Sequence, residues 1–144
     1  MADALVLVLR IAGERVAIRA CEVESVIEVE EVTPVPRTAP HVAGLTSLRS
    51  RILTVIDCRT ALGAQPLAAS EAVVVPADGH AYALLVDAVE DVVEPAGAPS
   101  PIALPLAGGW SGAASSTVVV GGDLLLLVDP HRLIAGPDSR AAAA

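Results

Sequence analysis

The stretch GERVAIRACEVESVIE (residues 13–28) decides the fold, because the chain repeats its pattern 66 positions later as GHAYALLVDAVEDVVE (residues 79–94). The identical pairs at this offset are Gly13/Gly79, Ala17/Ala83, Val23/Val89, Glu24/Glu90, Val26/Val92 and Glu28/Glu94. A chain rich in alanine and valine can produce one such match by chance. The repeat therefore needs support from a second pair of segments.

The second pair is ILTVIDCRTALG (residues 52–63) and LLLLVDPHRLIAG (residues 124–136). Each is an apolar strand, then an aspartate, then a short segment with arginine and leucine that stops at glycine. The two aspartates, Asp57 and Asp129, lie 72 positions apart, so about six residues are inserted in the second copy. The sequence thus predicts two copies of one supersecondary unit, and not a solenoid, which needs three or more repeats.

The composition favours strands. The chain has 144 residues, the size of one ordinary domain, and 53% of them are hydrophobic. Tyr82 and Trp110 are the only aromatic residues, so the core has to be built from valine, leucine, isoleucine and alanine. Valine-rich segments favour strands because two branches on Cβ suit a pleated surface.

Charge and residue usage exclude several classes of function. A net charge of −8 argues against nucleic-acid binding, which needs a basic surface to displace counterions from phosphates. All nine positive charges are arginine, and the absence of lysine excludes Schiff bases and P-loops.

The location is predicted from the first residues and the cysteines. The start, Met-Ala-Asp-Ala-Leu, has an acid where a signal peptide has positive charge, and no apolar run approaches the roughly 20 residues that span a bilayer. We expect a soluble, cytoplasmic protein without direct membrane insertion. Cys21 and Cys58 form no disulfide framework, so we expect reduced, buried thiols.

Apolar and alternating segments predict the strands, and glycines or charged pairs predict the turns between them. Strands are expected at residues 4–9, 15–19, 42–48, 52–56, 72–75 and 82–86, with turns at 12–14, 49–51, 78–79 and 121–122.

Short helical segments are expected at three places. Val23, Val26 and Ile27 have the spacing of one helical turn. Asp57 can cap a short helix that Gly63 ends, and Asp129 can cap a helix that begins with proline. Prolines hold residues 34–40 extended, while 64–70 is a linker by composition and 95–109 is a Pro/Ala/Gly-rich excursion.

These elements predict a mostly β fold of two pseudo-repeated, five-stranded β-barrel (SH3-like) subdomains that share a hydrophobic core, with short helices. The domain covers residues 1–136. Its first subdomain spans about 13–66 and its second about 70–136, with the N-terminal strand shared. Residues 137–144 are expected to be a disordered tail.

A search for chemistry finds no catalytic, cofactor or metal site. Asp57 at a strand end could be the phospho-acceptor of a receiver domain, but that site needs a lysine, and a helix cap is the better interpretation. Cys58 could pair with His41, His80 or His131 as a nucleophile, but no nucleophile elbow surrounds it, so a buried structural thiol is favoured. The three histidines lack the local spacing of common metal sites, and the glycines follow or link strands and are turns.

Two charged regions stand out. Residues 22–31 contain five glutamates, which form a solvated face by default and a partner contact as the alternative. Residues 37–59 hold four of the nine arginines against the single acid Asp57, a modest signal for an acidic or polar partner.

The stretch HVAGLTSLRSRILTVIDCRTALG (residues 41–63) resembles the signature of the CheW-type chemotaxis coupling proteins, roughly G-x-x-N-L-R-G-x-x-x-P-V-x-D-L. The matching residues are Gly44, Leu48, Arg49, Val55 and Asp57, while Ser47, Ser50 and Thr54 replace the asparagine, the glycine and the proline. Residues 32–44, 82–94 and 124–134 are similar to further segments of the family, so the resemblance runs from about Leu5 to Ile134.

The resemblance implies two five-stranded subdomains and a non-enzymatic adaptor without cofactors. Its partners would be the regulatory domain of a CheA-type histidine kinase and the cytoplasmic tip of methyl-accepting chemoreceptors, so the cytoplasmic protein would be recruited to membrane receptor arrays. Receptor contact is implied near the groove between the subdomains, at Val32, Gly44, Leu48 and Arg49. A serine at position 50 would be strained if its turn requires a positive φ.

Two alternatives stay open. The protein could be a small β-barrel ligand-binding module or enzyme with its site in the groove between the subdomains. Arg49 could also brace its own hairpin, through backbone carbonyls or Asp57, instead of contacting a partner.

Overall fold

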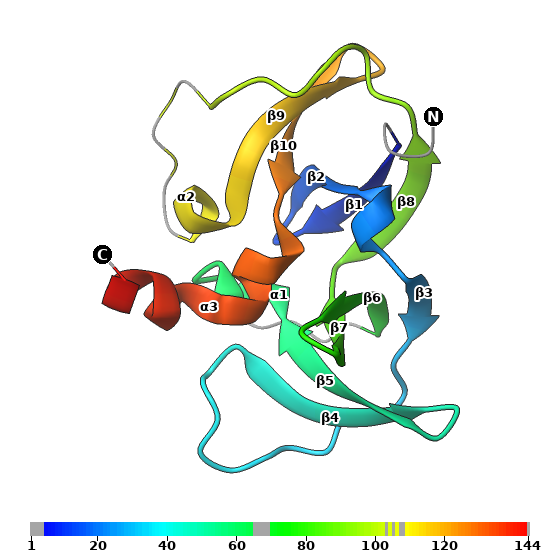
Figure 1. Ribbon diagram of the computed structural model, residues 1–144, viewed down its shortest axis with the longest axis vertical. Helices are drawn as coiled ribbons and strands as arrows, with labels where there is room; N and C mark the ends of the chain where they lie inside the picture. Colours follow the sequence, from blue (N-terminus) through cyan, green and yellow to red (C-terminus); the bar gives the residue numbers. More distant parts are fainter. Residues whose placement is uncertain (1–4, 65–69, 103, 105, 107–108, 144) are drawn as a thin grey trace.

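The computed structural model describes residues 5–64, 70–102, 104, 106 and 109–143, with side chains to residue 136. Ten strands form two five-stranded sheets, seen one above the other in Figure 1. The first sheet has the order β8-β1-β2-β10-β9, and the second has the order β3-β6-β7-β5-β4. Within the described residues, no helix is long and apolar enough to cross a membrane.

The elements have these bounds: β1 Val6–Ile11, β2 Glu14–Arg19, the 3₁₀ turn η2 Ala20–Glu22, β3 Ser25–Glu28, β4 Val42–Leu48, β5 Arg51–Asp57, α1 Cys58–Ala61, β6 Glu71–Ala77, β7 His80–Leu85, β8 Ala88–Val93, α2 Trp110–Ala113, β9 Ala114–Val120, β10 Asp123–Val128 and α3 Pro130–Ala143.

The sequence repeat is present in the strand registers. In the hairpin β1–β2, Val6 lies opposite Arg19, and in β6–β7, Ala72 lies opposite Leu85, at the same offset of 66 positions. The two parallel strand pairs, β10–β2 and β5–β7, are also equivalent: one partner is related by the offset of 66 positions and the other by the offset of 72. Leu126 faces Val16 where β10 meets β2, and Thr54 faces Tyr82 where β5 meets β7. The prediction of two copies of one unit is therefore confirmed.

The two copies exchange strands. The first sheet combines β1 and β2 of the first copy with β8, β9 and β10 of the second, and the second sheet has the reverse composition. The predicted subdomain boundaries, 13–66 and 70–136, do not coincide with the sheets, because residues 25–85 supply the whole second sheet. The sequence repeat reports which segments are equivalent, but not which of them pair.

The prediction of closed barrels is wrong. Among the described residues, the edge strands of the second sheet, β3 and β4, are not paired with each other, and an isolated bridge links Thr33, in the segment after β3, to Leu45 of β4. The first sheet has the matching bridge between Ser100 and Thr117. Each sheet curls without closing, and residues beyond β3 and β8 span the gap.

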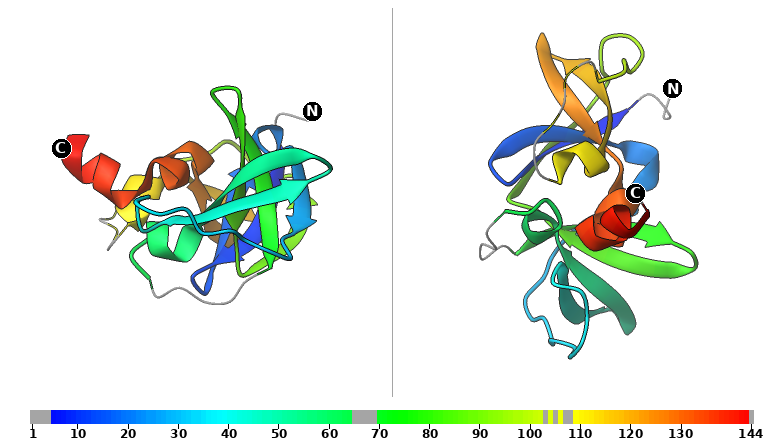
Figure 2. Two further views of the ribbon diagram at one scale, coloured as in Figure 1. Left: turned by 90° about the horizontal axis from the view of Figure 1, so that it is seen from below. Right: turned by 90° about the vertical axis from the view of Figure 1, so that its left-hand side faces the viewer.

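One core joins the two sheets. Its fully buried members include Leu9 and Ile18 of the first sheet, Leu84 of the second and Leu133 of α3. Burying such side chains contributes about 1.5–3 kcal/mol each. Helices α1 and α3 lie beside each other at the junction of the sheets, as the two views of Figure 2 also show.

Two local predictions differ from the structure. Between residues 20 and 28, helical backbone is confined to η2. Val26 and Ile27, where a helical turn was predicted, lie in strand β3, because Ser25–Glu28 pairs with β6 as the edge of the second sheet. At the other end, α3 continues to Ala143 past a break at Gly136, where the sequence predicted a disordered tail. The linker predicted at 64–70 lies mostly outside the described residues, as do parts of the 95–109 excursion.

Candidate functional site

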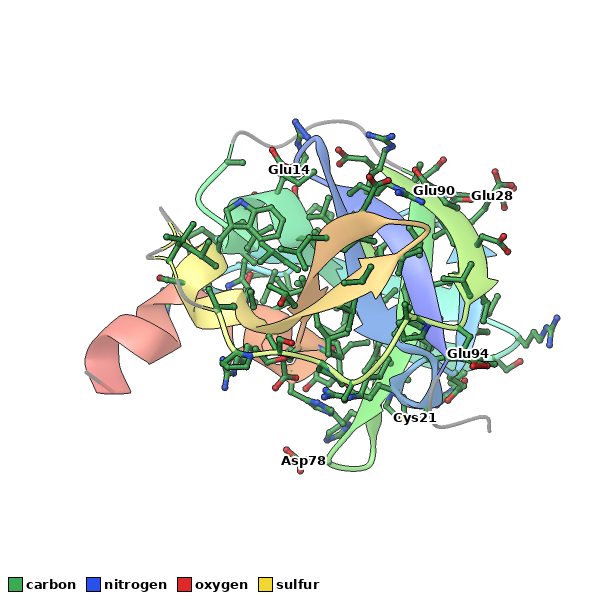
Figure 3. The ribbon with its side chains drawn as sticks, turned by 90° about the horizontal axis from the view of Figure 1, so that it is seen from above. Glu14, Cys21, Glu28, Asp78, Glu90 and Glu94 are labelled. Carbon is green, nitrogen blue, oxygen red and sulfur yellow. The ribbon has the colours of Figure 1, made fainter. Side chains whose placement is uncertain are left out.

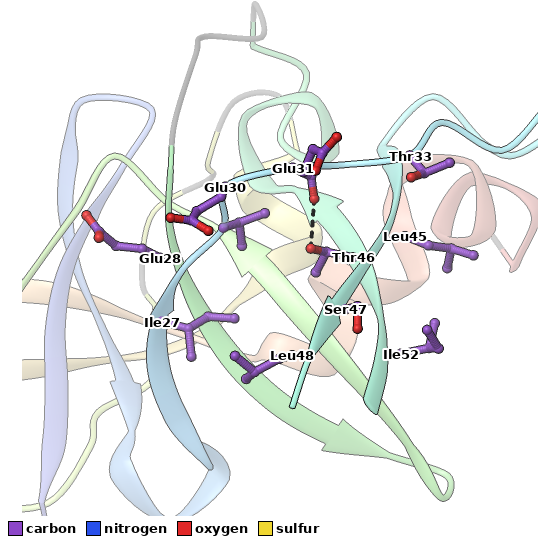
Figure 4. Close-up of a pocket in the computed structure, with 11 residues that line it drawn as sticks. Ile27, Glu28, Glu30, Glu31, Thr33, Leu45, Thr46, Ser47, Leu48 and Ile52 are labelled. Atoms are coloured by element: carbon purple, nitrogen blue, oxygen red, sulfur yellow. Dashed lines mark hydrogen bonds between the residues drawn. The ribbon is translucent and has the colours of Figure 1, made fainter. Parts of the chain in front are cut away.

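A groove of about 510 Å³ opens on the second sheet, between the segment that follows β3 and the hairpin β4–β5 (Figure 4). It is lined by Ile27, Glu28, Val29, Glu30, Glu31, Thr33, Leu45, Thr46, Ser47, Leu48 and Ile52. Leu45 and Ile52 expose 36% and 63% of their surface, so the lining includes exposed apolar side chains. A smaller groove of about 250 Å³ lies against the first sheet, beside residues 95–99.

Hydrogen bonds hold the walls of the larger groove together. The backbone N–H of Thr33 donates to the carbonyl of Leu45 at 2.8 Å, and Leu45 returns a bond to Thr33 at 2.9 Å. The hydroxyl of Thr46 donates to the carbonyl of Glu31 at 2.7 Å. These hydrogen bonds attach the segment after β3 to strand β4. The groove lies between this segment and the hairpin β4–β5.

Gly44 makes this close approach possible. Its φ is +147°, and a Cβ at this position would overlap the carbonyl oxygen of Thr33 and lie 3.0 Å from a methyl group of Val32. Strand β4 also carries a bulge between Val42 and Gly44. Gly44 and Val32 therefore meet beside the groove, and Leu48, further along β4, lines it.

Arg49 lies at the tip of the β4–β5 hairpin, next to this groove. Arg49 and Ser50 form the turn with φ values of 51° and 67°, and both are exposed. Among the described residues, the guanidinium of Arg49 has no hydrogen-bond or ion-pair partner. The alternative that Arg49 braces its own hairpin has no contact to support it.

The neighbouring arginine, Arg51, is the residue that braces this region. Its guanidinium donates two hydrogen bonds to the carboxylate of Glu24, at 2.5 and 3.2 Å. These bonds lower the pKa of Glu24 and raise the pKa of Arg51. Arg59 in turn lies 3.3 Å from a carboxylate oxygen of Asp87. Two of the four arginines in residues 37–59 are thus paired with acids, and the local positive excess reduces to Arg37 and Arg49.

The acidic region of the sequence falls partly on the rim of the groove. Glu28, Glu30 and Glu31 line it, and all three are exposed. They lie at the end of β3 and on the segment after it, on one side of the groove, whose lining also includes apolar residues such as Ile27 and Leu48. The groove therefore has a negatively charged side next to apolar surface, and Arg49 lies at the tip of the adjoining hairpin.

The two aspartates at the strand ends make the hydrogen bonds of helix caps. The carboxylate of Asp57 accepts from the N–H groups of Arg59 and Thr60 at 3.0 and 3.3 Å. The carboxylate of Asp129 accepts from the N–H of His131 at 2.9 Å. Each aspartate thereby satisfies backbone donors that the first turn of a helix leaves without partners.

A cluster that the sequence did not predict joins Glu22 to Asp129 and His131. Their donor atoms lie within 4.8 Å of one another. One carboxylate oxygen of Glu22 is buried and has no hydrogen-bond partner in the described part of the chain. Burial, and next the negative charge of Asp129, raise the pKa of Glu22. Glu22 is far from α3 in sequence, so no local motif could reveal the cluster.

The charge of Asp129 in this cluster is balanced by the protein itself. Its second oxygen lies 3.6 Å from the guanidinium of Arg132, and its first is engaged in the cap. Carboxylates and imidazole are ligands that divalent cations accept, but here the cap and the ion pair already occupy the oxygens of Asp129. We therefore assign no metal to the cluster.

The geometry of the thiols argues against nucleophilic chemistry. Cys58 is fully buried, and burial, together with the negative charges of Asp57 and Asp87, raises its pKa far above the ordinary value. A thiol so strongly held in the neutral form is a poor nucleophile. Cys21 is exposed at the periphery of the molecule (Figure 3), so the expectation that both thiols are buried was wrong.

The alternative hypothesis places a ligand-binding or catalytic site in a groove between the subdomains. Neither of the two grooves described above lies there. Each of the two grooves is lined by residues of a single sheet. The residues expected near an inter-subdomain groove, including Val32, Gly44 and Arg49, all lie on the open side of the second sheet.

Comparison with known proteins supports the family. A search of solved structures finds the scaffolding protein TtCheW from Thermoanaerobacter tengcongensis, with a TM-score of 0.80 and 21% sequence identity over 91% of this chain and 92% of that one. At that identity the likeness establishes the fold alone. No curated protein matches the chain. The family model described as the CheW-like domain matches residues 5–137, so the chain belongs to the family of CheW-like domains.

Proposed function

We propose that the protein is a non-enzymatic adaptor that couples methyl-accepting chemoreceptors to a CheA-type histidine kinase. Membership of the CheW-like family supports a role in chemotaxis signalling. The relative of similar fold is described as a scaffolding protein. In this role the protein acts in the cytoplasm and joins membrane receptor arrays through its partners.

The observation that carries the proposal is the open groove of the second sheet with Arg49 beside it. Exposed apolar side chains, among them Leu45 and Ile52, offer a docking surface, since burial of apolar surface is the dominant favourable term in most protein–protein association. The side chain of Arg49 has no partner among the described residues, and its planar guanidinium can bind the carbonyls or carboxylates of a receptor helix. Leu48 lines this groove, and the close approach of Gly44 to Val32 and Thr33 lies beside it.

The surface needs no chemistry of its own for this role. The adaptor acts by holding two proteins together, so its output depends on affinity and geometry. The kinase regulatory domain then binds a separate part of the molecule, because one groove cannot hold two partners at once.

A binding experiment tests the proposal. The purified protein is mixed with the regulatory domain of the cognate kinase and with a receptor cytoplasmic fragment, separately and together, and complexes are isolated by size exclusion. We expect two binary complexes and one ternary complex. Failure to bind either partner at micromolar concentrations would refute the adaptor function.

A further inference from the structure

His41 is a buried histidine that none of the preceding functions uses. It exposes 5% of its surface and is the one polar residue that is buried in the described part of the chain. Its Nε2 lies 2.8 Å from the carbonyl oxygen of Ile134 in α3. A carbonyl can only accept, so the hydrogen lies on Nε2 and the ring donates it.

The ring of His41 also occupies the space beside the break in α3. Gly136 has φ +79°, and a Cβ at this position would overlap three atoms of the His41 ring. Glycine is therefore required at position 136 by both its backbone angle and its neighbour. The first part of α3 thus ends at Gly136, next to the imidazole ring of His41.

The backbone of His41 contacts a third element. Its carbonyl accepts a hydrogen bond from the N–H of Asp57 at 2.8 Å, where β5 passes into α1. Strand β4 begins at the next residue, and Gly44 on that strand presses against Thr33 at the groove. One residue thus touches α3, the end of β5 and the start of the strand that forms a groove wall.

The equivalent place in the other copy is built differently. The N–H of Asp129 donates to the carbonyl of Ala113 at 2.9 Å, as that of Asp57 does to His41. Alanine there has no side chain that could reach a helix. The end of α1 is instead held by a backbone bond from Gly109 to the carbonyl of Leu62 at 3.2 Å. In both copies, a hydrogen bond holds the carbonyl near the end of the short helix, that of Leu62 in one copy and that of Ile134 in the other. The donor to Leu62 is a backbone N–H, whereas the donor to Ile134 is the His41 side chain.

We propose that His41 is a positioning residue that locks α3 to the start of β4 and thereby sets the geometry of the groove. The link to binding rests on the proposed function, whereas the lock itself does not. A displacement of α3 would be transmitted through the His41 side chain to strand β4, which forms one wall of the groove. The variants that test the lock are His41→Phe, which keeps a ring but removes the donor, and His41→Gln, which keeps an N–H donor at similar reach.

Hydrogen exchange on the free protein tests the lock. In His41→Phe we expect the amides of β4 to exchange about tenfold faster, while those of β8 and β9 keep their rates. His41→Gln should restore the rates, and Gly136→Ala, which displaces the ring from the helix side, should reproduce the His41→Phe pattern. His80→Ala removes an exposed histidine from β7 and is the matched control, with no change expected.

The same variants are then tested for receptor binding. His41→Phe and Gly136→Ala should each weaken binding of the receptor fragment about tenfold, and His41→Gln should bind as the parent does. Equal acceleration of exchange in both sheets, or unchanged exchange in β4, overturns the lock. Faster exchange in β4 with unchanged receptor affinity overturns its effect on the groove. If the parent protein binds no receptor fragment, the adaptor function fails, and the exchange rates still decide the lock.

Discussion

Ser50 and Gly122 occupy the same position of the same turn in the two copies, and Ser50 alone has a side chain there. The turn residues are Arg49 and Ser50 in the hairpin β4–β5, and Gly121 and Gly122 in β9–β10. Their φ values are 51° and 67° in the first turn and 56° and 86° in the second. The second turn thus shows what the geometry prefers, and the first copy carries strain at Ser50 that the sequence predicted.

We expect Ser50→Gly to stabilise the protein by about 1 kcal/mol, because a left-handed backbone costs a non-glycine residue about that much. In a chain of this size the melting temperature should rise by about 2–4 °C. Gly122→Ser is the control in the equivalent turn and should lower it by a similar amount. If Ser50→Gly lowers the melting temperature, the serine side chain stabilises this turn by more than the backbone strain costs.

Replacing either capping aspartate should destabilise the protein. Asp57→Ala and Asp129→Ala each remove the acceptor for N–H groups at a helix start, and each should cost about 0.5–2 kcal/mol in urea unfolding. Asp57→Asn retains the acceptor and should lose less. An Asp57→Ala protein of normal stability that lost a phosphorylation signal would revive the interpretation of Asp57 as a phospho-acceptor.

Glu22→Gln should stabilise the protein at neutral pH and lose that advantage in acid. The pKa of Glu22 is raised in the folded state by burial and by Asp129, so the folded protein binds this proton more tightly than the unfolded chain does. The stabilisation from protonation is complete below the ordinary pKa and is lost as the pH rises through the raised one. Melting curves at pH 4 and pH 7 measure the difference.

The test on Glu22 has two controls. A larger gain from Glu22→Gln at pH 4 than at pH 7 would contradict the sign of the shift. EDTA should leave the melting temperature of the parent protein unchanged, because we assign no metal to Glu22, Asp129 and His131. A fall in melting temperature that zinc reverses would place a cation there.

The two thiols should differ in reactivity. In denaturant without reductant, a thiol reagent should count two groups per chain, since Cys21 and Cys58 are both free. In the folded protein only Cys21 should react rapidly, because Cys58 is buried and its thiolate is strongly disfavoured. Cys21→Ser should abolish the fast reaction. A disulfide would instead give no reactive group in denaturant.

Arg49→Ala should separate binding from folding. We expect the variant to keep its melting temperature within a few degrees, since Arg49 is exposed and has no partner among the described residues. It should still bind the kinase regulatory domain, and should lose receptor-dependent control of the kinase. Truncating a charge-assisted interface contact commonly costs about 2 kcal/mol or more.

Arg37→Ala is the matched control for Arg49→Ala, because it removes the same charge from an exposed loop away from the groove. It should retain receptor-dependent control. A large fall in melting temperature in Arg49→Ala, with normal coupling by the protein that stays folded, would show that the side chain braces the hairpin.

The features that the sequence predicted correctly are local. Gly79 follows Asp78 in a hairpin turn, and Asp57 precedes a short helix, because turn and cap preferences act over two or three residues. The repeat could also be predicted from the sequence, since equivalent residues of the two copies lie in similar environments. Val26 and Val92, one repeat apart, are both exposed on edge strands.

The features that it missed depend on contacts between distant residues. The spacing of Val23, Val26 and Ile27 suits a helical turn, but pairing with β6 makes residues 25–28 a strand. The proximity of Glu22 to His131 and the hydrogen bond of His41 to Ile134 have no local signature in the sequence. The family resemblance pointed to Leu48, which lines the groove, but it expected a groove between subdomains, whereas this one lies on a single sheet. Receptor binding by Val32, Gly44, Leu48 and Arg49 stays a prediction.

Because each sheet combines strands of both copies, the two sheets can be completed only at different stages of synthesis. Residues 16 and 126 must meet to join β2 to β10. The first sheet therefore stays incomplete until the chain has been synthesised through Val128, whereas the second sheet needs nothing beyond residue 85. During synthesis the hairpin β1–β2 waits with unpaired edges, and such edges are where newly made chains aggregate.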